Sequence, residues 1–126
     1  MLYLGLKTLH MIGWSLWIGG MVLALTALSR GVPAKGALLD TTRAVTGIGI
    51  ALAWLGGLSI AWLGGWYLDG WFVAKLGFVL LLSGLHGAVL ARMRRDAPLP
   101  LGPGILGAIH IAALALVIWI ALVKPF

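Results

Sequence analysis

The chain contains no cysteine, and it has only three acidic residues, none of which lies in the interior of a hydrophobic run. Without cysteine it can form no disulfide, no thiolate metal site and no thiol nucleophile. Without a carboxylate inside those runs, it lacks the general base that zinc hydrolysis needs and a proton relay built on Asp or Glu. Histidine and lysine are therefore the main ionisable side chains in the interior of these runs.

Long polar stretches are also missing. Of all residues 62% are hydrophobic and 10% are charged, and the mean hydropathy is +1.10. This composition is typical of integral membrane proteins. The net charge of +6 does not indicate a nucleic-acid partner, because the cations sit at the ends of hydrophobic runs and not on a solvated basic face.

Four apolar runs are separated by the short breaks RGVPAKG, GGWYLDG and RRDAPLPLGP. A helix that spans a bilayer needs about 20 apolar residues, so the runs predict four transmembrane helices. We expect these helices at about 2–29, 38–63, 71–92 and 104–123. Because the breaks are short, consecutive helices should be antiparallel neighbours. The predicted fold is a single all-α domain, an integral membrane four-helix up-down bundle.

The lysine and arginine residues predict how the bundle is oriented. Six of the nine lie in or beside the first and third breaks, namely Arg30, Lys35, Arg43, Arg92, Arg94 and Arg95. The positive-inside rule then places these two breaks in the cytoplasm and both termini outside. Trp66, Tyr67 and Trp71, at the outer ends of the second and third helices, fit an aromatic belt at the membrane interface.

The second helix carries a ladder of small residues at every fourth position: Gly49, Ala53, Gly57, Ala61 and Gly65. Such a ladder lets a neighbouring helix backbone approach closely. The neighbour can be another helix of this chain or a second copy of the protein, so the sequence does not decide between a monomer and a homo-oligomer.

Ionisable side chains are costly inside a bilayer, so each one found there is a candidate for function. The candidates are His10, Lys75, His86 and His110, with Arg43 near the start of the second helix. Each also has a structural interpretation. His10 can be an interfacial residue among belt tryptophans, Lys75 can snorkel to the headgroups, and His86 or His110 can hydrogen-bond between helices.

Depth along the membrane divides the histidines into two groups. At about 1.5 Å per residue from the outer helix ends, His86 and His110 lie near 22 and 21 Å, and His10 lies near about 12 Å. His10 shares its helix face with Lys7, Trp14 and Trp17, which offer a cation and two flat surfaces. His86 and His110 are level and can form a facing pair.

Three histidines without cysteine or membrane carboxylates favour an imidazole-ligated haem. Copper is the alternative metal. However, only Met11 and Met21 lie in the membrane, ten residues apart, so no methionine cluster selects Cu(I). The histidines that a metal could use are His10, His86 and His110, and depth along the membrane favours His86 together with His110.

Three motifs resemble the HemJ family, which overlaps with the CopD-like membrane proteins. They are LKTLHMIGWSLWIGG, WFVAKLGFVLLLSGLHG followed by ARMRR, and the terminal ALVKPF. The resemblance implies a bacterial inner-membrane protein that binds haem b and oxidises protoporphyrinogen IX to protoporphyrin IX. It also implies that His10 ligates the haem, that Lys75 is a required lysine, and that His86 matches a later histidine of the third helix. Where the family has an Asn-Glu-x-Pro block at the start of its fourth helix, this chain has GAIH, which contains His110.

The predicted function is therefore that of a haem-b oxidoreductase which passes electrons to a membrane acceptor such as a quinone. Lys75 and His86 are the expected catalytic residues. The expected cofactor contacts are His10, His86, His110, Trp14, Trp17 and Arg43. Two alternatives stay open: a haem electron carrier that uses His86 and His110 as axial ligands, and a CopD-like copper transport protein.

Overall fold

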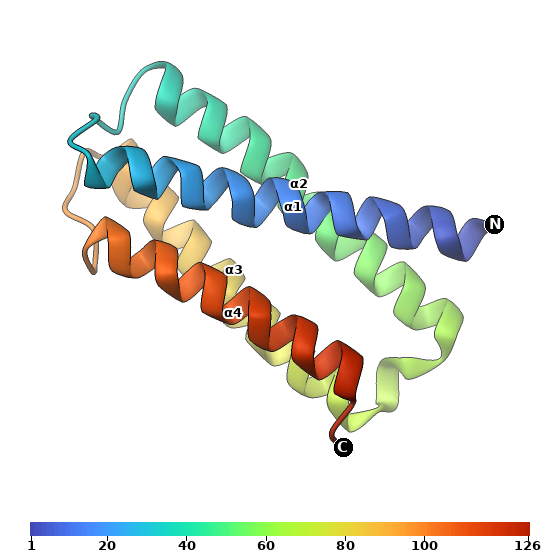
Figure 1. Ribbon diagram of the computed structural model, residues 1–126. Coiled ribbons are helices and arrows are strands. Elements are labelled where there is room, and N and C mark those ends of the chain that lie inside the picture. Colours follow the sequence, from blue (N-terminus) through green and yellow to red (C-terminus); the bar gives the residue numbers. More distant parts are fainter.

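The computed structural model describes residues 1–126 and contains four long helices and no strand. They are α1 (Leu2–Ser29), α2 (Ala37–Gly64), α3 (Gly70–Arg94) and α4 (Pro103–Val123), with a short 3-10 helix, η1 (Trp66–Leu68), before α3 (Figure 1). Each end of α1 to α4 lies within two residues of the expected position. All four helices are long and apolar enough to cross a membrane, which confirms the predicted all-α membrane bundle.

Glycine and proline mark two of the helix ends. Gly65, the last residue of the small-residue ladder, has φ of +69° and ends α2 in a left-handed conformation that favours glycine. Pro103 opens α4, where its missing N–H costs no helical hydrogen bond.

The helices run alternately up and down. The α1–α2 and α3–α4 connections therefore lie at one end, and both termini lie at the other end together with the α2–α3 connection (Figure 1). The closest pair is α1 with α2, followed by α1 with α4 and α3 with α4. Although consecutive in sequence, α2 and α3 touch at few points, one of them a hydrogen bond from Trp54 Nε1 to Ser83 Oγ of 3.0 Å. The expectation that consecutive helices pack as neighbours thus holds for α1–α2 and α3–α4 but only weakly for α2–α3.

Glycines let α1 and α2 cross closely. A Cβ atom added to Gly13 would overlap the backbone nitrogen of Ala53, and one added to Gly49 would overlap that of Trp17. No side chain fits at either position without moving a backbone. The ladder positions Gly49 and Ala53 therefore pack against α1 of the same chain.

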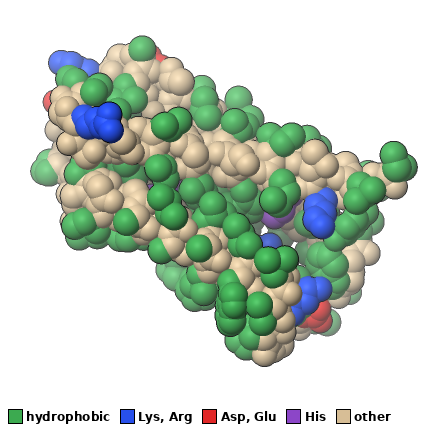
Figure 2. Space-filling view, viewed as in Figure 1, with side chains coloured by type: hydrophobic (Ala, Val, Ile, Leu, Met, Phe, Trp, Pro, Cys, Tyr) green, Lys and Arg blue, Asp and Glu red, His purple; other side chains and the backbone are tan.

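Two buried apolar clusters join α1 to α3 and α4. The first contains Trp14, Trp17, Ile18, Ala53, Val79, Leu82 and Val117, and the second contains Met21, Leu25, Val89, Met93 and Leu106. Large apolar side chains are also exposed along all four helices, as the outer surface of the bundle shows (Figure 2). In a membrane, these exposed side chains contact lipid.

Candidate functional site

A cleft of about 450 Å³ lies at the end of the bundle that carries the termini, where the α1–α2 pair diverges from the α3–α4 pair (Figure 1). All four helices contribute to its mostly apolar wall. Figure 2 shows it as a hollow with a histidine in its wall and cationic side chains around it. Its size falls within the range of about 300–1,000 Å³ that is usual for ligand pockets.

Three lysines line the cleft and no acidic residue does. Lys75 of α3 is partly buried in its wall, and Lys7 and Lys124 are exposed at its rim. The Nζ atom of Lys124 lies 5.1 Å from the ring centre of Trp66 and 4.9 Å from that of Trp71, so cation–π contacts hold it there. The cleft therefore favours a ligand with an apolar body and negatively charged groups.

His10 forms part of the wall, with only 8% of its surface exposed. Its Nδ1 atom must be the donor to the carbonyl oxygen of Ala53, 2.7 Å away, because a carbonyl can only accept. Nε2 is then an acceptor, and it receives the indole N–H of Trp14 at 3.1 Å. A Nδ1–H bond to a backbone carbonyl, with a lone pair kept on Nε2, is the arrangement found in metal-ligating histidines.

Two glycines of α2 make room for this imidazole. A Cβ atom at Gly56 would lie 3.0 Å from Cβ of His10, and one at Gly57 would lie 2.8 Å from Cε1 of its ring. An alanine at Gly57 would thus displace the ring. The ladder of small residues therefore has a second role beyond helix packing, since its third member, Gly57, leaves space for the ring of His10.

The two tryptophans expected beside His10 take different places. Their rings stack with centroids 5.0 Å apart, but only Trp14 lines the cleft, and Trp17 is fully buried toward the centre of the bundle. Trp14 therefore offers a flat apolar surface to a ligand, while its indole N–H is bonded to His10. Arg43 lies far from the cleft, because it is exposed near the start of α2, at the opposite end of the bundle.

His86 and His110 do not line the cleft. They are buried in the centre of the bundle, 6% and 0% exposed, and each lies on its helix between residues of the two apolar clusters. The ring of His86 meets the ring of Trp17 edge-on at 6.0 Å, and Nδ1 of His110 donates to the carbonyl of Leu106 at 2.8 Å. The structure thus brings His10 together with Lys75, and His86 together with His110.

No three or more side chains of the types His, Cys, Asp and Glu form a group that could hold a metal ion. A metal at His10 would therefore need further donors from a cofactor. A haem would meet that requirement, since it brings its own nitrogen donors and would need only one imidazole from the chain, that of His10. His10, the apolar wall and the lysines fit such a group.

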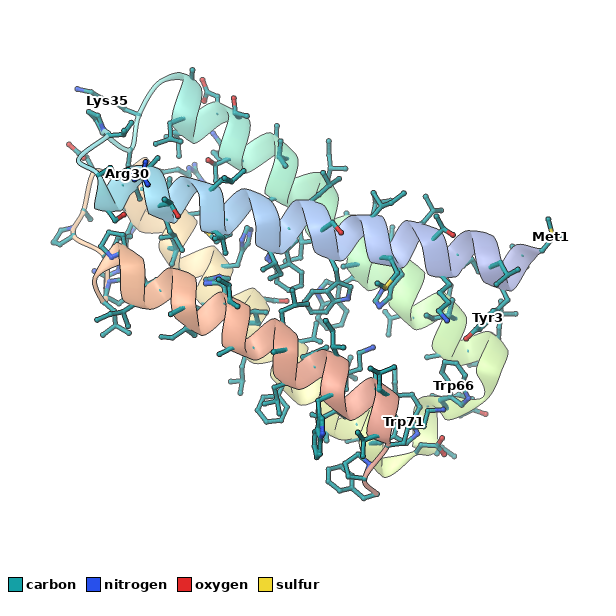
Figure 3. The ribbon with its side chains drawn as sticks, in the orientation of Figure 1. Met1, Tyr3, Arg30, Lys35, Trp66 and Trp71 are labelled. Atoms are coloured by element: carbon teal, nitrogen blue, oxygen red, sulfur yellow. The ribbon has the colours of Figure 1, made fainter.

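The sequence reasoning missed the rim of the cleft. The sequence predicts only an aromatic belt for Trp66 and Trp71, yet together with Tyr3 they line the outer end of the cleft (Figure 3). The chain after α4 folds back there, with the N–H of Trp71 donating to the carbonyl oxygen of Phe126 at 3.0 Å. This contact brings Lys124 to the cleft. The terminal ALVKPF motif could have indicated this position of Lys124, because its lysine directly follows α4 at the end of the bundle that carries Trp66 and Trp71.

Comparisons with protein-family models, with curated proteins and with solved structures found no match to this chain. The functional inference therefore depends on the side chains of the cleft and on the sequence motifs.

Proposed function

We propose that the protein is a membrane oxidoreductase that binds haem b and oxidises protoporphyrinogen IX to protoporphyrin IX, with a membrane quinone accepting the electrons. One observation carries the proposal: a histidine with the hydrogen bonding of a metal ligand lies in the wall of an apolar, lysine-lined cleft. The three motifs that resemble the HemJ family support the same activity.

His10 is the residue that would hold the haem iron, through Nε2. The bond from its Nδ1 to Ala53 fixes the ring and makes Nε2 a stronger donor to a metal. Nε2 of His10 accepts a hydrogen bond from the indole N–H of Trp14. This bond would have to break when Nε2 binds the haem iron, and the indole N–H would then need another acceptor. Bound haem would supply one-electron chemistry, which none of the chain's own side chains provides.

The lysines would bind and orient the carboxylates of the porphyrins. An ammonium group is a compact charge with three N–H donors, which suits a propionate. Lys75 in the wall and Lys7 and Lys124 at the rim offer such groups at different depths of the cleft. With no acidic residue in the wall, nothing in the cleft competes for these cations.

The cleft is also open to the membrane, in which the substrate would be dissolved. Its lining includes Met11 of α1 and Ile118 and Leu122 of α4, which are 55%, 44% and 78% exposed. These side chains face lipid and lie on the two helices that diverge at this end. Haem would therefore enter the cleft from the bilayer between α1 and α4, and a porphyrinogen dissolved in the bilayer would meet the bound haem on that side.

An absorption spectrum of the protein, purified in lipid nanodiscs and supplied with haem, tests the cofactor. We expect a reduced-minus-oxidised haem b spectrum that is lost in His10→Ala and largely kept in His110→Ala, with both variants helical by circular dichroism. If His10→Ala keeps the haem while His110→Ala loses it, the iron lies at the central histidine pair and the proposed site is wrong.

Turnover of protoporphyrinogen IX, followed by the fluorescence of protoporphyrin IX with a quinone present, tests the reaction. The wild-type protein should form the product faster than the His10→Ala variant. A normal haem spectrum without turnover would contradict the oxidase and favour the electron carrier instead.

A further inference from the structure

Three buried nitrogen atoms at the centre of the bundle have no hydrogen-bond partner: Nε1 of Trp17, Nδ1 of His86 and Nε2 of His110. They come from α1, α3 and α4, and the three side chains are 0%, 6% and 0% exposed. Buried polar atoms are nearly always paired with protein or with water, because an unpaired one loses its bond to solvent without replacement. Three such atoms in one protein core indicate a shared partner.

Packing places the three side chains at one level of the bundle. His86 lies between Leu82, which belongs to the same buried cluster as Trp17, and Val89 of the second cluster. His110 likewise lies between Leu106 of the second cluster and Ala113, which packs against the first. His86 also touches the ring of Trp17, with centroids 6.0 Å apart. The two imidazoles and the indole therefore lie at the level where the clusters join, with His86 against Trp17.

The hydrogen-bonding states of His110 and Trp17 restrict what can lie between them. Nδ1 of His110 donates to the carbonyl of Leu106, so in the neutral ring Nε2 carries a lone pair and can only accept. The indole nitrogen of Trp17 can only donate. The partner must therefore donate to His110 and accept from Trp17. A bare cation cannot accept, and a carbonyl oxygen cannot donate.

We propose that Trp17, His86 and His110 enclose a binding site for a buried water molecule that links α1, α3 and α4. Water is the smallest molecule that both donates and accepts, and a buried water needs two to four polar partners, which these three side chains provide. The site is separate from the cleft, because none of the three residues lines it. The proposal does not depend on haem binding.

Solid-state NMR in lipid bilayers tests the proposal through magnetisation transfer from water to nitrogen-labelled side chains. The signals of Trp17 Nε1, His86 and His110 should receive water magnetisation, although all three side chains are buried in the middle of the membrane. The methyl groups of Leu25 and Leu106, both 0% exposed, serve as a dry control in the same sample. Absence of transfer to the three side chains in a folded sample would overturn the proposal.

Substitution of one member tests whether the three side chains share one water. In His110→Leu the water loses one of its three partners, so the transfer to Trp17 and to His86 should fall together, and unchanged transfer at both would contradict a shared molecule. If His110→Leu does not fold, Trp17→Phe keeps both imidazoles and should weaken transfer to them. Elemental analysis of the haem-free protein completes the test. A stoichiometric metal ion that is lost in His110→Leu but kept in Trp17→Phe would show a metal in place of water, because an indole N–H cannot ligate a metal.

Discussion

Nδ1 of His10 donates a hydrogen bond to the carbonyl oxygen of Ala53, 2.7 Å away, and this bond ties the cleft's histidine on α1 to the backbone of α2. A carbonyl oxygen has two lone pairs, so it can accept the imidazole and still take part in its own helix. The contact forms because Gly56 and Gly57 leave α2 without side chains at this point. The orientation of the candidate metal ligand is thus set by a neighbouring helix.

Gly57→Ala should weaken haem binding more than it changes the fold. The new Cβ atom would lie 2.8 Å from Cε1 of His10 and push the ring from its bond with Ala53. We expect a loss of about tenfold in affinity, or about 1.4 kcal/mol, measured by spectroscopic haem titration. Gly47→Ala is the matched control on the same helix, because nothing lies within 4 Å of its Cβ position. Equal affinity in both variants would show that the ring has room to move.

Gly13→Ala should destabilise the bundle strongly. Its Cβ atom would overlap backbone atoms of α2, including the carbonyl oxygen of Gly49 at 2.8 Å, so α1 and α2 would have to separate. Overpacking of this kind typically costs about 1–3 kcal/mol. Thermal unfolding in detergent measures the effect. Gly19→Ala, on the same helix with open space around it, should unfold close to the wild-type temperature.

Lys75→Met should keep the fold and the haem spectrum but lose most porphyrinogen oxidation. The substitution preserves the apolar stem and removes a hydrogen bond to a carboxylate, which contributes about 1.5–3 kcal/mol. The readout is the KM and rate of protoporphyrin formation. Lys35→Met, exposed in the α1–α2 connection at the other end, serves as the control. Unchanged turnover in Lys75→Met would identify Lys75 as a snorkelling residue.

The α1–α2 and α3–α4 connections should lie in the cytoplasm. The chain has no native cysteine, so single cysteines at Ala34 and Ala97 can be labelled without background. A membrane-impermeant maleimide added to intact cells should not react with either one. Leu68→Cys, in the α2–α3 connection at the opposite end, should react under the same conditions because Leu68 is 83% exposed. Labelling at Ala34→Cys and Ala97→Cys but not at Leu68→Cys would show that the protein has the opposite orientation in the membrane.

The sequence by itself determined the four helices and their bounds. Apolar runs of membrane length, broken by glycine, proline and charge, leave the backbone no other way to satisfy its hydrogen bonds in lipid. It also gave the candidate residues, since an ionisable side chain within such a run stands out from its neighbours.

Only the tertiary structure decided which of these residues meet. Helical periodicity gives the face of each residue but not the neighbour of that face, so the sequence did not settle whether His10 or the pair of His86 and His110 would hold a metal. The close crossing of α1 and α2 at Gly13 and Gly49 decided the arrangement. This crossing places His10 against Gly57. The α1–α2 pair then diverges from the α3–α4 pair, which leaves a cleft lined by His10 and Lys75. His86 and His110 lie nearer the centre and are buried with Trp17. The physical reason is that helix packing depends on backbone approach and side-chain volume across the interface, which a linear pattern does not contain.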